Sequence, residues 1–503
     1  MIPVVDIFAG PGGLNEGFSS VLDPASNKPV FKTAVSIEME QSAVNTLTLR
    51  AAYRHLLRSD EGLPQAYQDF LDGRTSLTDL HNDSRFASAY KQAQKEVRHF
   101  ELSENSRADS DKMIEEALGN DPSEWILIGG PPCQAYSLAG RSRRTNDLDF
   151  ENDHKHFLYR EYLHIIKRFK PAIYVMENVK GLLSATNGGS KMFELIRRDL
   201  TSPSDNLTYK LHSMVVETDE EEPGPEDFII RAEDFGIPQK RHRVIIIGVR
   251  EDLNLGAPAV LEKSAPVTVR EAIGNLPKIR SSVSRTADHD GQLWADVRRN
   301  IREIARRDTL LETLPAPSNV KLDTLSLAQA VAPSDTVLNN ASAKCYHDWI
   351  AEHAGSATLQ HEARGHMIQD LQRYYLLSAL AHSVTDSPKV RQLPRGYWPN
   401  HKNVESAAMP FEDRFRVQVW NKPSTTIVSH IAKDGHYYIH PDPSQMRSLT
   451  VREAARLQTF PDNYVFVGNR TQQYTQVGNA VPPLLAHKIG KAIADLLLCS
   501  TSS

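Results

Sequence analysis

The stretch from Val4 to Phe18 reads VVDIFAGPGGLNEGF, and it predicts a buried strand, a glycine-rich turn and a helix in that order. Glycines let the backbone approach a ligand closely, and the amides that begin the next helix can donate to a carboxylate or a phosphate. A second strand, Lys32 to Ile37, ends in Glu38, which is either an ordinary solvated carboxylate or an acceptor for ribose hydroxyls. The two features together predict an adenosine-bearing cofactor.

The composition predicts a soluble globular protein of two or three domains, because 503 residues exceed one ordinary core and 40% of them are hydrophobic. The net charge of -5 means that any basic surface must be local. The three cysteines, Cys133, Cys345 and Cys499, lack the spacing of a disulfide framework or a zinc site. Because no targeting signal or membrane-length apolar run is found, we expect a cytoplasmic protein without membrane contact.

Strand and helix patterns alternate through residue 250, which predicts an α/β fold with a doubly wound, mainly parallel sheet whose site lies at the carboxyl ends of its strands. A polar, mostly helical insertion is expected at about 41–121. From 251 to 446 the prolines become frequent and the rhythm is lost, so we expect a separate domain or a long excursion. Residues 447–503 predict a helix capped by Thr450 and Glu453, then a last helix whose apolar stripe needs the N-terminal sheet as its partner.

A thiol follows one of the predicted strands. Residues 128–137 read IGGPPCQAYS and place Cys133 just past an apolar run, where two prolines stiffen the backbone. Taken alone, Cys133 is equally well a nucleophile or a small buried hydrophobe. The basic loop at 140–147 can close over an anionic polymer or be a solvated surface loop.

Charged residues end or open two other strands. Glu177 follows the apolar strand 171–176, where a carboxylate is costly unless it is partnered or used, so it is a candidate general acid. Arg241 and Arg243 belong to a basic cluster that opens a strand so apolar that it must be central. Cys133, Glu177 and the glycine turn are therefore expected on the same edge of the sheet.

The region after residue 250 offers one candidate surface for an anionic polymer. A predicted helix at 295–308 carries a basic face that could grip phosphates or simply be solvated, formed by Arg298, Arg299, Arg302, Arg306 and Arg307. His361 and His366 are five positions apart and would not share a helix face, so no metal site is expected.

The ordered motifs DIFAGPGG at 6–13, GPPCQ at 130–134, ENV at 177–179, QKRHR at 239–243 and QVGN at 476–479 resemble those of the bacterial DNA (cytosine-5) methyltransferases. The resemblance spans most of the chain, from residue 6 to 483. It implies a Rossmann-like domain that binds S-adenosylmethionine, completed by the first and last motifs. It also implies that residues 251–446 form a target-recognition domain.

The resemblance implies a role for each catalytic candidate. The Cys133 thiolate would add to carbon 6 of a flipped cytosine, and Glu177 would act at ring nitrogen 3. Arg243, together with Arg241, would hold the cytosine O2 or a nearby phosphate and help to keep the cysteine ionised. Residue-by-residue matching implies a cofactor pocket of Phe8, Gly10, Gly13, Leu14, Glu38, Pro132, Leu158, Asn479 and Val481. The acidic residue that the family places near the adenine after the third strand has no clear match, with Asp79 as the candidate.

The expected partner is duplex DNA, bound by a monomer in the cytoplasm at the nucleoid, within a restriction-modification or related defence system. The resemblance leaves two other functions open. One is a transfer-RNA cytosine-5 methyltransferase on the same scaffold, which the long recognition region disfavours. The other is a DNA-binding protein without catalysis, which the presence of Cys133, Glu177 and Arg243 disfavours.

Overall fold

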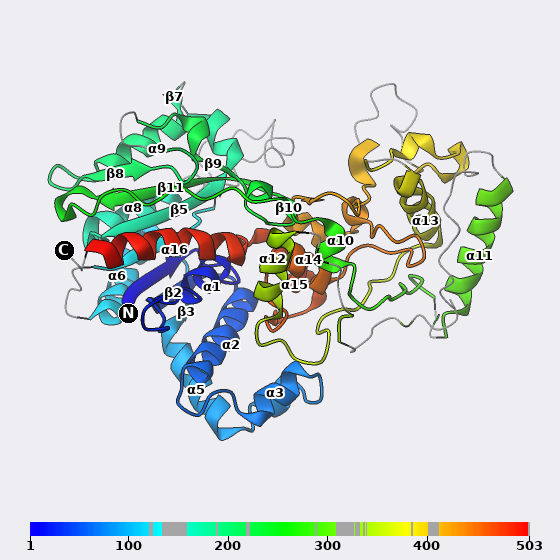
Figure 1. Ribbon diagram of the computed structural model, residues 1–503, viewed down its shortest axis with the longest axis horizontal. Helices are drawn as coiled ribbons and strands as arrows, with labels where there is room; N and C mark the ends of the chain where they lie inside the picture. The colour runs from blue at the N-terminus through cyan, green and yellow to red at the C-terminus, as the bar shows by residue number, and fades with distance from the viewer. Residues whose placement is uncertain are drawn as a thin grey trace.

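The computed structural model describes residues 1–119, 124–132, 158–187, 190–217, 222–286, 288, 290–307, 326, 332–334, 338, 340–383, 386–400 and 412–500. Its centre is a sheet of eight strands in which seven follow the order β3-β2-β1-β4-β5-β11-β8, and β9 pairs with β11 (Figure 1). The strands are β1 (Ile2–Ile7), β2 (Phe31–Glu38), β3 (Val97–His99), β4 (Ile126–Gly129), β5 (Ile173–Val179), β8 (Tyr209–His212), β9 (Ile229–Arg231) and β11 (His242–Arg250).

Most of the sheet is parallel, as the sequence predicts. The pairs formed by β1, β2, β3, β4 and β5 are all parallel, whereas β11 runs antiparallel to β5, β8 and β9. The carboxyl ends of β1, β4 and β5 therefore meet at one edge, while β11 brings its amino end to the same edge. This reversal places residues that open β11 beside residues that end β5.

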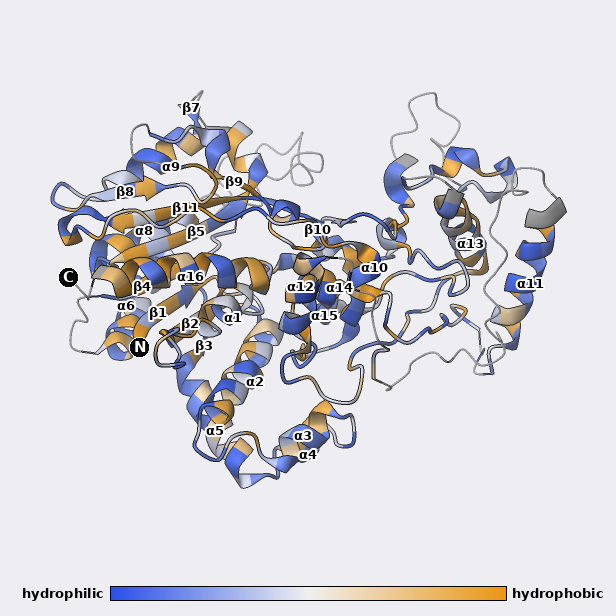
Figure 2. Ribbon diagram, in the orientation of Figure 1, coloured by the Kyte–Doolittle hydropathy of each residue, from blue (hydrophilic) through white to orange (hydrophobic). Residues whose placement is uncertain are grey.

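Strand β1 shows why helices cover both faces of the sheet. Val4 joins one core with Leu14 and Phe18, whereas Val5 and Ile7 join a second core on the other face. Because side chains alternate along a strand, continuous apolarity requires apolar partners on both sides. Figure 2 shows the corresponding concentration of hydrophobic residues in the central strands. The covering helices include α1 (Gly13–Ser19), α6 (Arg107–Leu118), α8 (Leu158–Phe169), α9 (Met192–Thr201) and α16 (Pro483–Ser500).

The segment predicted as a helical insertion holds most of its residues in helices, but it also contributes the edge strand β3. Its helices share a core of their own and are α2 (Gln41–Leu57), α3 (Gln65–Leu71), α4 (Leu77–Leu80) and α5 (Ser84–Glu96), with α6 following β3. Strand β3 pairs with β2 from Ser36 to Glu38. The third strand of the sheet therefore begins only at residue 97.

The C-terminal segment returns to the start of the chain. It contains α14 (Val451–Leu457), α15 (Arg470–Asn479) and α16, and the capping box predicted for Thr450 and Glu453 is present. Helix α16 packs on α1 so closely that a Cβ at Gly17 would lie 2.4 Å from the Ala486 Cβ. The apolar stripe of the last helix thus packs on the helix that follows the glycine turn.

The region between β11 and α14 extends away from the sheet, to the right in Figure 1. It holds α10 (Val269–Ile273), α11 (Gln292–Arg307), α12 (Ala341–Ala351) and α13 (Ile368–Ser383), with the short strand β12 (Ser424–Thr425) returning to pair with β10 (Gln239–Lys240). Helices α11 and α13 contribute to a separate hydrophobic core. Among the described residues, the helices are too short or too polar to cross a membrane, and His, Cys, Asp and Glu form no group of three suited to a metal.

Candidate active site

An ion pair at the end of β5 is the centre of the site. Arg243 donates from Nε to Glu177 Oε1 at 2.9 Å, and the two side chains are 14% and 13% exposed. They come from the antiparallel strands β11 and β5, in which Arg243 is paired with Val179 and Ile245 with Glu177. Burial lowers the pKa of Arg243, and the neighbouring Glu177 carboxylate opposes that effect. The pair supplies a fixed carboxylate and a cation at the edge where β4 and β5 end.

The chain that leaves β4 passes directly over Glu177. A Cβ at Gly130 would lie 2.9 Å from Glu177 Oε2, so glycine leaves room for the carboxylate. Asn178 donates from Nδ2 to the Pro131 carbonyl at 3.3 Å, and its Oδ1 accepts from Val179 N at 2.8 Å. Asn178 therefore ties the segment that leads toward Cys133 to the end of β5. Cys133 itself, like the basic loop at 140–147, lies outside the described residues.

Arg241 occupies a different position from Arg243. Its side chain is buried, and it donates from one terminal nitrogen to the carbonyl oxygens of Ile427 at 2.8 Å and Gly478 at 3.4 Å. Burial lowers the pKa of Arg241 well below its usual value, and the neighbouring Arg243 adds to that effect. Arg241 thus connects the last part of the recognition region with α15. The site brings Arg243, rather than Arg241, face to face with Glu177.

The glycine turn has the backbone geometry of a ligand cradle. Phe8, Gly10 and Gly12 have φ values of 52°, 55° and 89°, which fall in the left-handed region. The Gly10 N–H donates to Glu38 Oε2 at 2.8 Å, while Glu40 N donates to Glu38 Oε1 at 2.8 Å. A Cβ at Gly10 would meet nothing within 4 Å, so the turn is open on that side. Glu38 is thereby fixed beside the turn with lone pairs still free for a ligand.

The end of α15 completes this cradle from the far end of the chain. A Cβ at Gly13 would lie 2.1 Å from the Val481 carbonyl oxygen, so the start of α1 and the residues after α15 are in direct backbone contact. Asn479 is exposed at the last position of α15, although Val481 is buried. Pro132 and Leu158 are half-buried, the first just after β4 and the second at the start of α8. The residues fit a nucleoside cofactor, because open glycine backbone, a fixed carboxylate and an exposed amide converge there.

The position of the third strand offers a different candidate for the acidic residue near the adenine. Asp79 lies in α4 and closes a capping box with Ser76, accepting from its hydroxyl at 2.7 Å. Since β3 begins at residue 97, the first carboxylate after the third strand is Glu101, which is exposed. Strand β3 has only three residues and follows four helices, so periodicity alone does not reveal it. Asn178 was also missed as a positioning group, although its place in the ENV motif was a signal.

The basic helix α11 is only partly available for contact with a polymer. Arg298 is buried with its guanidinium 5.8 Å from the Trp294 ring, whereas Arg299 is exposed and pairs with Asp296 at 2.9 Å. Arg302 is half-buried, and the side chains of Arg306 and Arg307 are outside the described set. The described part of this face is therefore less basic than the sequence pattern indicates.

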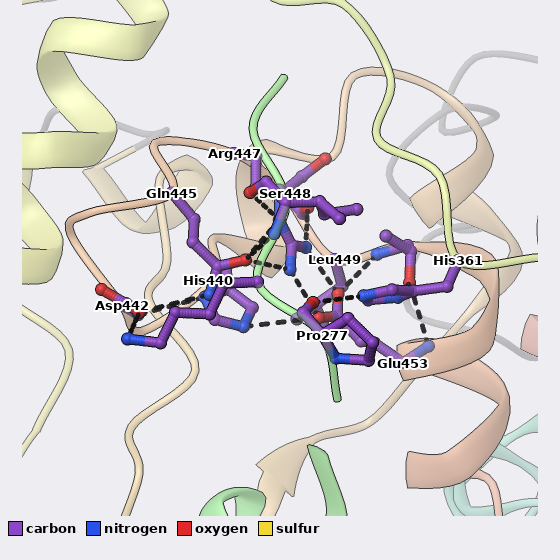
Figure 3. A network of polar contacts seen from close by, with 12 residues as sticks. Pro277, His361, His440, Asp442, Gln445, Arg447, Ser448, Leu449 and Glu453 are labelled. Atoms are coloured by element: carbon purple, nitrogen blue, oxygen red, sulfur yellow. Dashed lines mark hydrogen bonds and ion pairs between the residues drawn. The ribbon is translucent and has the colours of Figure 1, made fainter. Parts of the chain in front are cut away.

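A buried polar network joins the recognition region to α14 (Figure 3). Arg447 forms two 2.7 Å hydrogen bonds to Glu453, with both side chains 1% exposed. His361 contacts the Pro277 carbonyl through Nε2 at 2.7 Å and the Thr450 hydroxyl through Nδ1 at 3.0 Å. His361 is thus a hydrogen-bonded part of the interior.

Comparisons with known proteins agree on one family. Residues 74–495 match the C-5 cytosine-specific DNA methylases. The chain is 32% identical to type II methyltransferase M.Bpa9945I of Bacillus paralicheniformis over 98% of this chain and 99% of that protein. It is 27% identical to the DNA (cytosine-5-)-methyltransferase M.ApeKI of Aeropyrum pernix, over 74% of this chain and 81% of that protein. A candidate DNA modification methyltransferase from an Escherichia coli prophage shares the fold, with a TM-score of 0.53, 18% identity and coverage of 99% of this chain and 100% of that chain.

Proposed function

This chain belongs to the C-5 cytosine-specific DNA methylases, and we propose that it methylates a flipped cytosine in one duplex DNA sequence through a covalent adduct at Cys133. As a DNA (cytosine-5-)-methyltransferase it acts on DNA and depends on S-adenosylmethionine. The observation that carries the proposed mechanism is the Glu177–Arg243 pair, which lies against Gly130 in the segment that leads to Cys133.

The proposed chemistry begins with the weak nucleophilicity of cytosine carbon 5. The Cys133 thiolate adds to carbon 6, and the ring then carries an enamine that is nucleophilic at carbon 5. Glu177, in its protonated form, donates its proton to ring nitrogen 3, where negative charge would otherwise develop, and takes the proton back when Cys133 is eliminated. Arg243 holds Glu177 in place and offers its remaining donors to the cytosine O2. A base removes the carbon 5 proton after methylation, and the elimination of Cys133 restores the aromatic ring.

The cofactor, when bound, supplies an electrophilic methyl group on a sulfonium. In the proposed pocket, Phe8, Gly10, Gly13 and Leu14 would surround its amino acid and adenine parts, and Glu38 would accept from the ribose hydroxyls. Glu101 would take the role of the acidic residue near the adenine amino group, because it follows the third strand. The pocket is completed by Pro132, Leu158, Asn479 and Val481.

Arg241 contributes to the proposed site by holding its parts together. Its bonds to the carbonyls of Ile427 and Gly478 link the end of the recognition region to the helix that ends in Asn479. Contact with a phosphate would require a buried guanidinium to leave both carbonyls. The cytosine contact is therefore assigned to Arg243 alone.

The biological setting that we propose is a type II restriction-modification system. The support is the relatedness to type II methyltransferases, including M.Bpa9945I of Bacillus paralicheniformis and M1.HphI of Haemophilus parahaemolyticus, which is 24% identical over 98% of this chain. The residues at 251–446 would then read the target sequence. We expect a monomer to bind the duplex.

The direct test is bisulfite sequencing of duplex DNA after incubation with the protein and S-adenosylmethionine. Protected cytosines should fall in one recurring sequence, and protection of transfer RNA without DNA would contradict the proposal. Cys133→Ala should abolish both methyl transfer and covalent trapping on DNA that contains 5-fluorocytosine. Cys345→Ala is the matched control, because Cys345 is a free, exposed thiol on α12 and should leave both unchanged.

A further inference from the structure

The glycine turn is held from behind by one tyrosine of the C-terminal segment. Tyr464 is 1% exposed, and its hydroxyl donates to the carbonyl oxygen of Pro11. A Cβ at Gly12 would lie 3.2 Å from the same hydroxyl oxygen, so Tyr464 also touches the turn at its next residue. On the other side of the turn, Gly10 donates to Glu38. The turn is therefore fixed between Glu38 and Tyr464.

Tyr464 is itself held by a buried cation. The guanidinium of Arg50 lies 4.9 Å from the centre of the Tyr464 ring and 4.1 Å from the centre of the Tyr53 ring. Arg50 comes from α2 and is 6% exposed. It donates to Asn463 Oδ1 at 2.8 Å, which fixes the residue next to Tyr464 in the chain. The position of the tyrosine thus depends on a side chain outside the C-terminal segment.

Arg50 also holds the helix that follows the turn. It donates from Nε to Glu16 Oε2 at 2.9 Å, and a second nitrogen donates to Glu16 Oε1. Burial alone would raise the pKa of Glu16, but Arg50 lowers it below its usual value, so the carboxylate stays charged. One guanidinium therefore binds the helix after the turn, the residue before Tyr464 and the face of Tyr464. Buried charges are costly, and this one is satisfied only when both α1 and the segment 463–464 are in place.

We propose that Tyr464 and Arg50 are positioning residues for the cofactor turn, and that they set the affinity for S-adenosylmethionine without taking part in methyl transfer. This inference rests on the proposed cofactor pocket. If the hydroxyl is removed, the Pro11 carbonyl is left unsatisfied in the interior unless the turn moves. If the glycine turn moves, the hydrogen bond from Gly10 to Glu38 is disturbed, and the proposed ribose contact depends on that bond.

The test compares Tyr464→Phe with Tyr209→Phe, a matched control. Tyr209 is also fully buried and also donates to a proline carbonyl, that of Pro171 at 2.8 Å, but it lies in β8, an edge strand four positions from β1 in the sheet. Binding of S-adenosylmethionine and S-adenosylhomocysteine is measured by calorimetry without DNA, and methyl transfer to duplex DNA is measured against cofactor concentration. Melting temperature is recorded for each variant.

Tyr464→Phe should raise the Kd and the KM for the cofactor by about two- to tenfold, the range of one net hydrogen bond, while kcat at saturating cofactor stays at the wild-type value. Tyr209→Phe should lose similar thermal stability and keep wild-type cofactor affinity. Arg50→Lys retains the charge beside Glu16 but not the fork to Asn463, and it should weaken cofactor binding with the tyrosine hydroxyl intact.

Equal cofactor affinities for wild type, Tyr464→Phe and Arg50→Lys would overturn the inference, as would a loss confined to kcat. A wild-type protein that does not bind the cofactor would overturn the proposed pocket and the inference together. Wild-type binding with unaffected variants would leave the proposed pocket standing and remove only the positioning role.

Discussion

Arg447→Met should strongly destabilise the protein, because it leaves a carboxylate charged and buried without its cation. Glu453 is 1% exposed and loses two 2.7 Å hydrogen bonds, while the bond from Thr450 N at 2.7 Å remains. His440 lies 3.4 Å from Glu453, and burial together with the neighbouring Arg447 lowers its pKa in the wild-type protein. Breaking a buried pair in this way costs about 3 to 5 kcal/mol.

The assay is urea unfolding at pH 7.5, followed by circular dichroism and by tryptophan fluorescence. The double variant Arg447→Met with Glu453→Gln should recover most of the loss, because a neutral amide can still accept from Thr450 N and carries no buried charge. Lys344→Met is the surface control, since Lys344 pairs with Asp348 at 2.8 Å with both side chains more than half exposed.

If Arg447→Met lowers the free energy of unfolding by less than about 1 kcal/mol, the buried pair is worth no more than a surface ion pair, and the prediction is wrong. So would a double variant as unstable as the single one. Arg447 also donates to the Ile279 carbonyl at 3.3 Å, so the single variant should loosen the recognition region and raise the KM for DNA.

Three further predictions follow from the site and its supports. Glu177→Gln should lower kcat by about 10²- to 10⁴-fold with little change in cofactor affinity. If steady-state methylation by the variant has the wild-type kcat, Glu177 is not the proton donor. Gly478→Ala should lower both the melting temperature and the cofactor affinity. The new Cβ would lie 2.2 Å from Ser429 N, so the backbone would shift and displace Asn479. A variant with wild-type stability and wild-type cofactor affinity would contradict this prediction. Burial lowers the pKa of His361 from 6.5 to about 4, so in that window the unfolded chain binds a proton that the folded chain does not, and stability decreases as the pH is lowered. His361→Gln should remove a slope of about 1.4 kcal/mol per pH unit from acid-dependent unfolding curves between these values, and an unchanged slope would exclude His361 as its source.

The sequence was sufficient for the features whose signals are local. The glycine turn, the apolar strands, the capped helix at Thr450 and the basic opening of β11 are all encoded by neighbouring residues, and they predicted the mainly parallel sheet. The resemblance of the ordered motifs predicted the family, and the family comparison confirms it. Glu38 beside the turn was also a prediction from the chain, and its bond to Gly10 shows the two in contact.

Tertiary structure alone decided which residues from distant segments contact one another at the site. The antiparallel course of β11 placed Arg243 on Glu177 and left Arg241 buried against Ile427 and Gly478, although both arginines stand in one short motif. Alternate residues of a strand share a face, but burial depends on what packs at each end of that strand. Because the third strand begins only at residue 97, the candidate for the acidic residue near the adenine changes from Asp79 to Glu101. Tyr464 contacts the glycine turn from 453 positions away, and no local pattern encodes this contact because only the tertiary packing brings the two loops together.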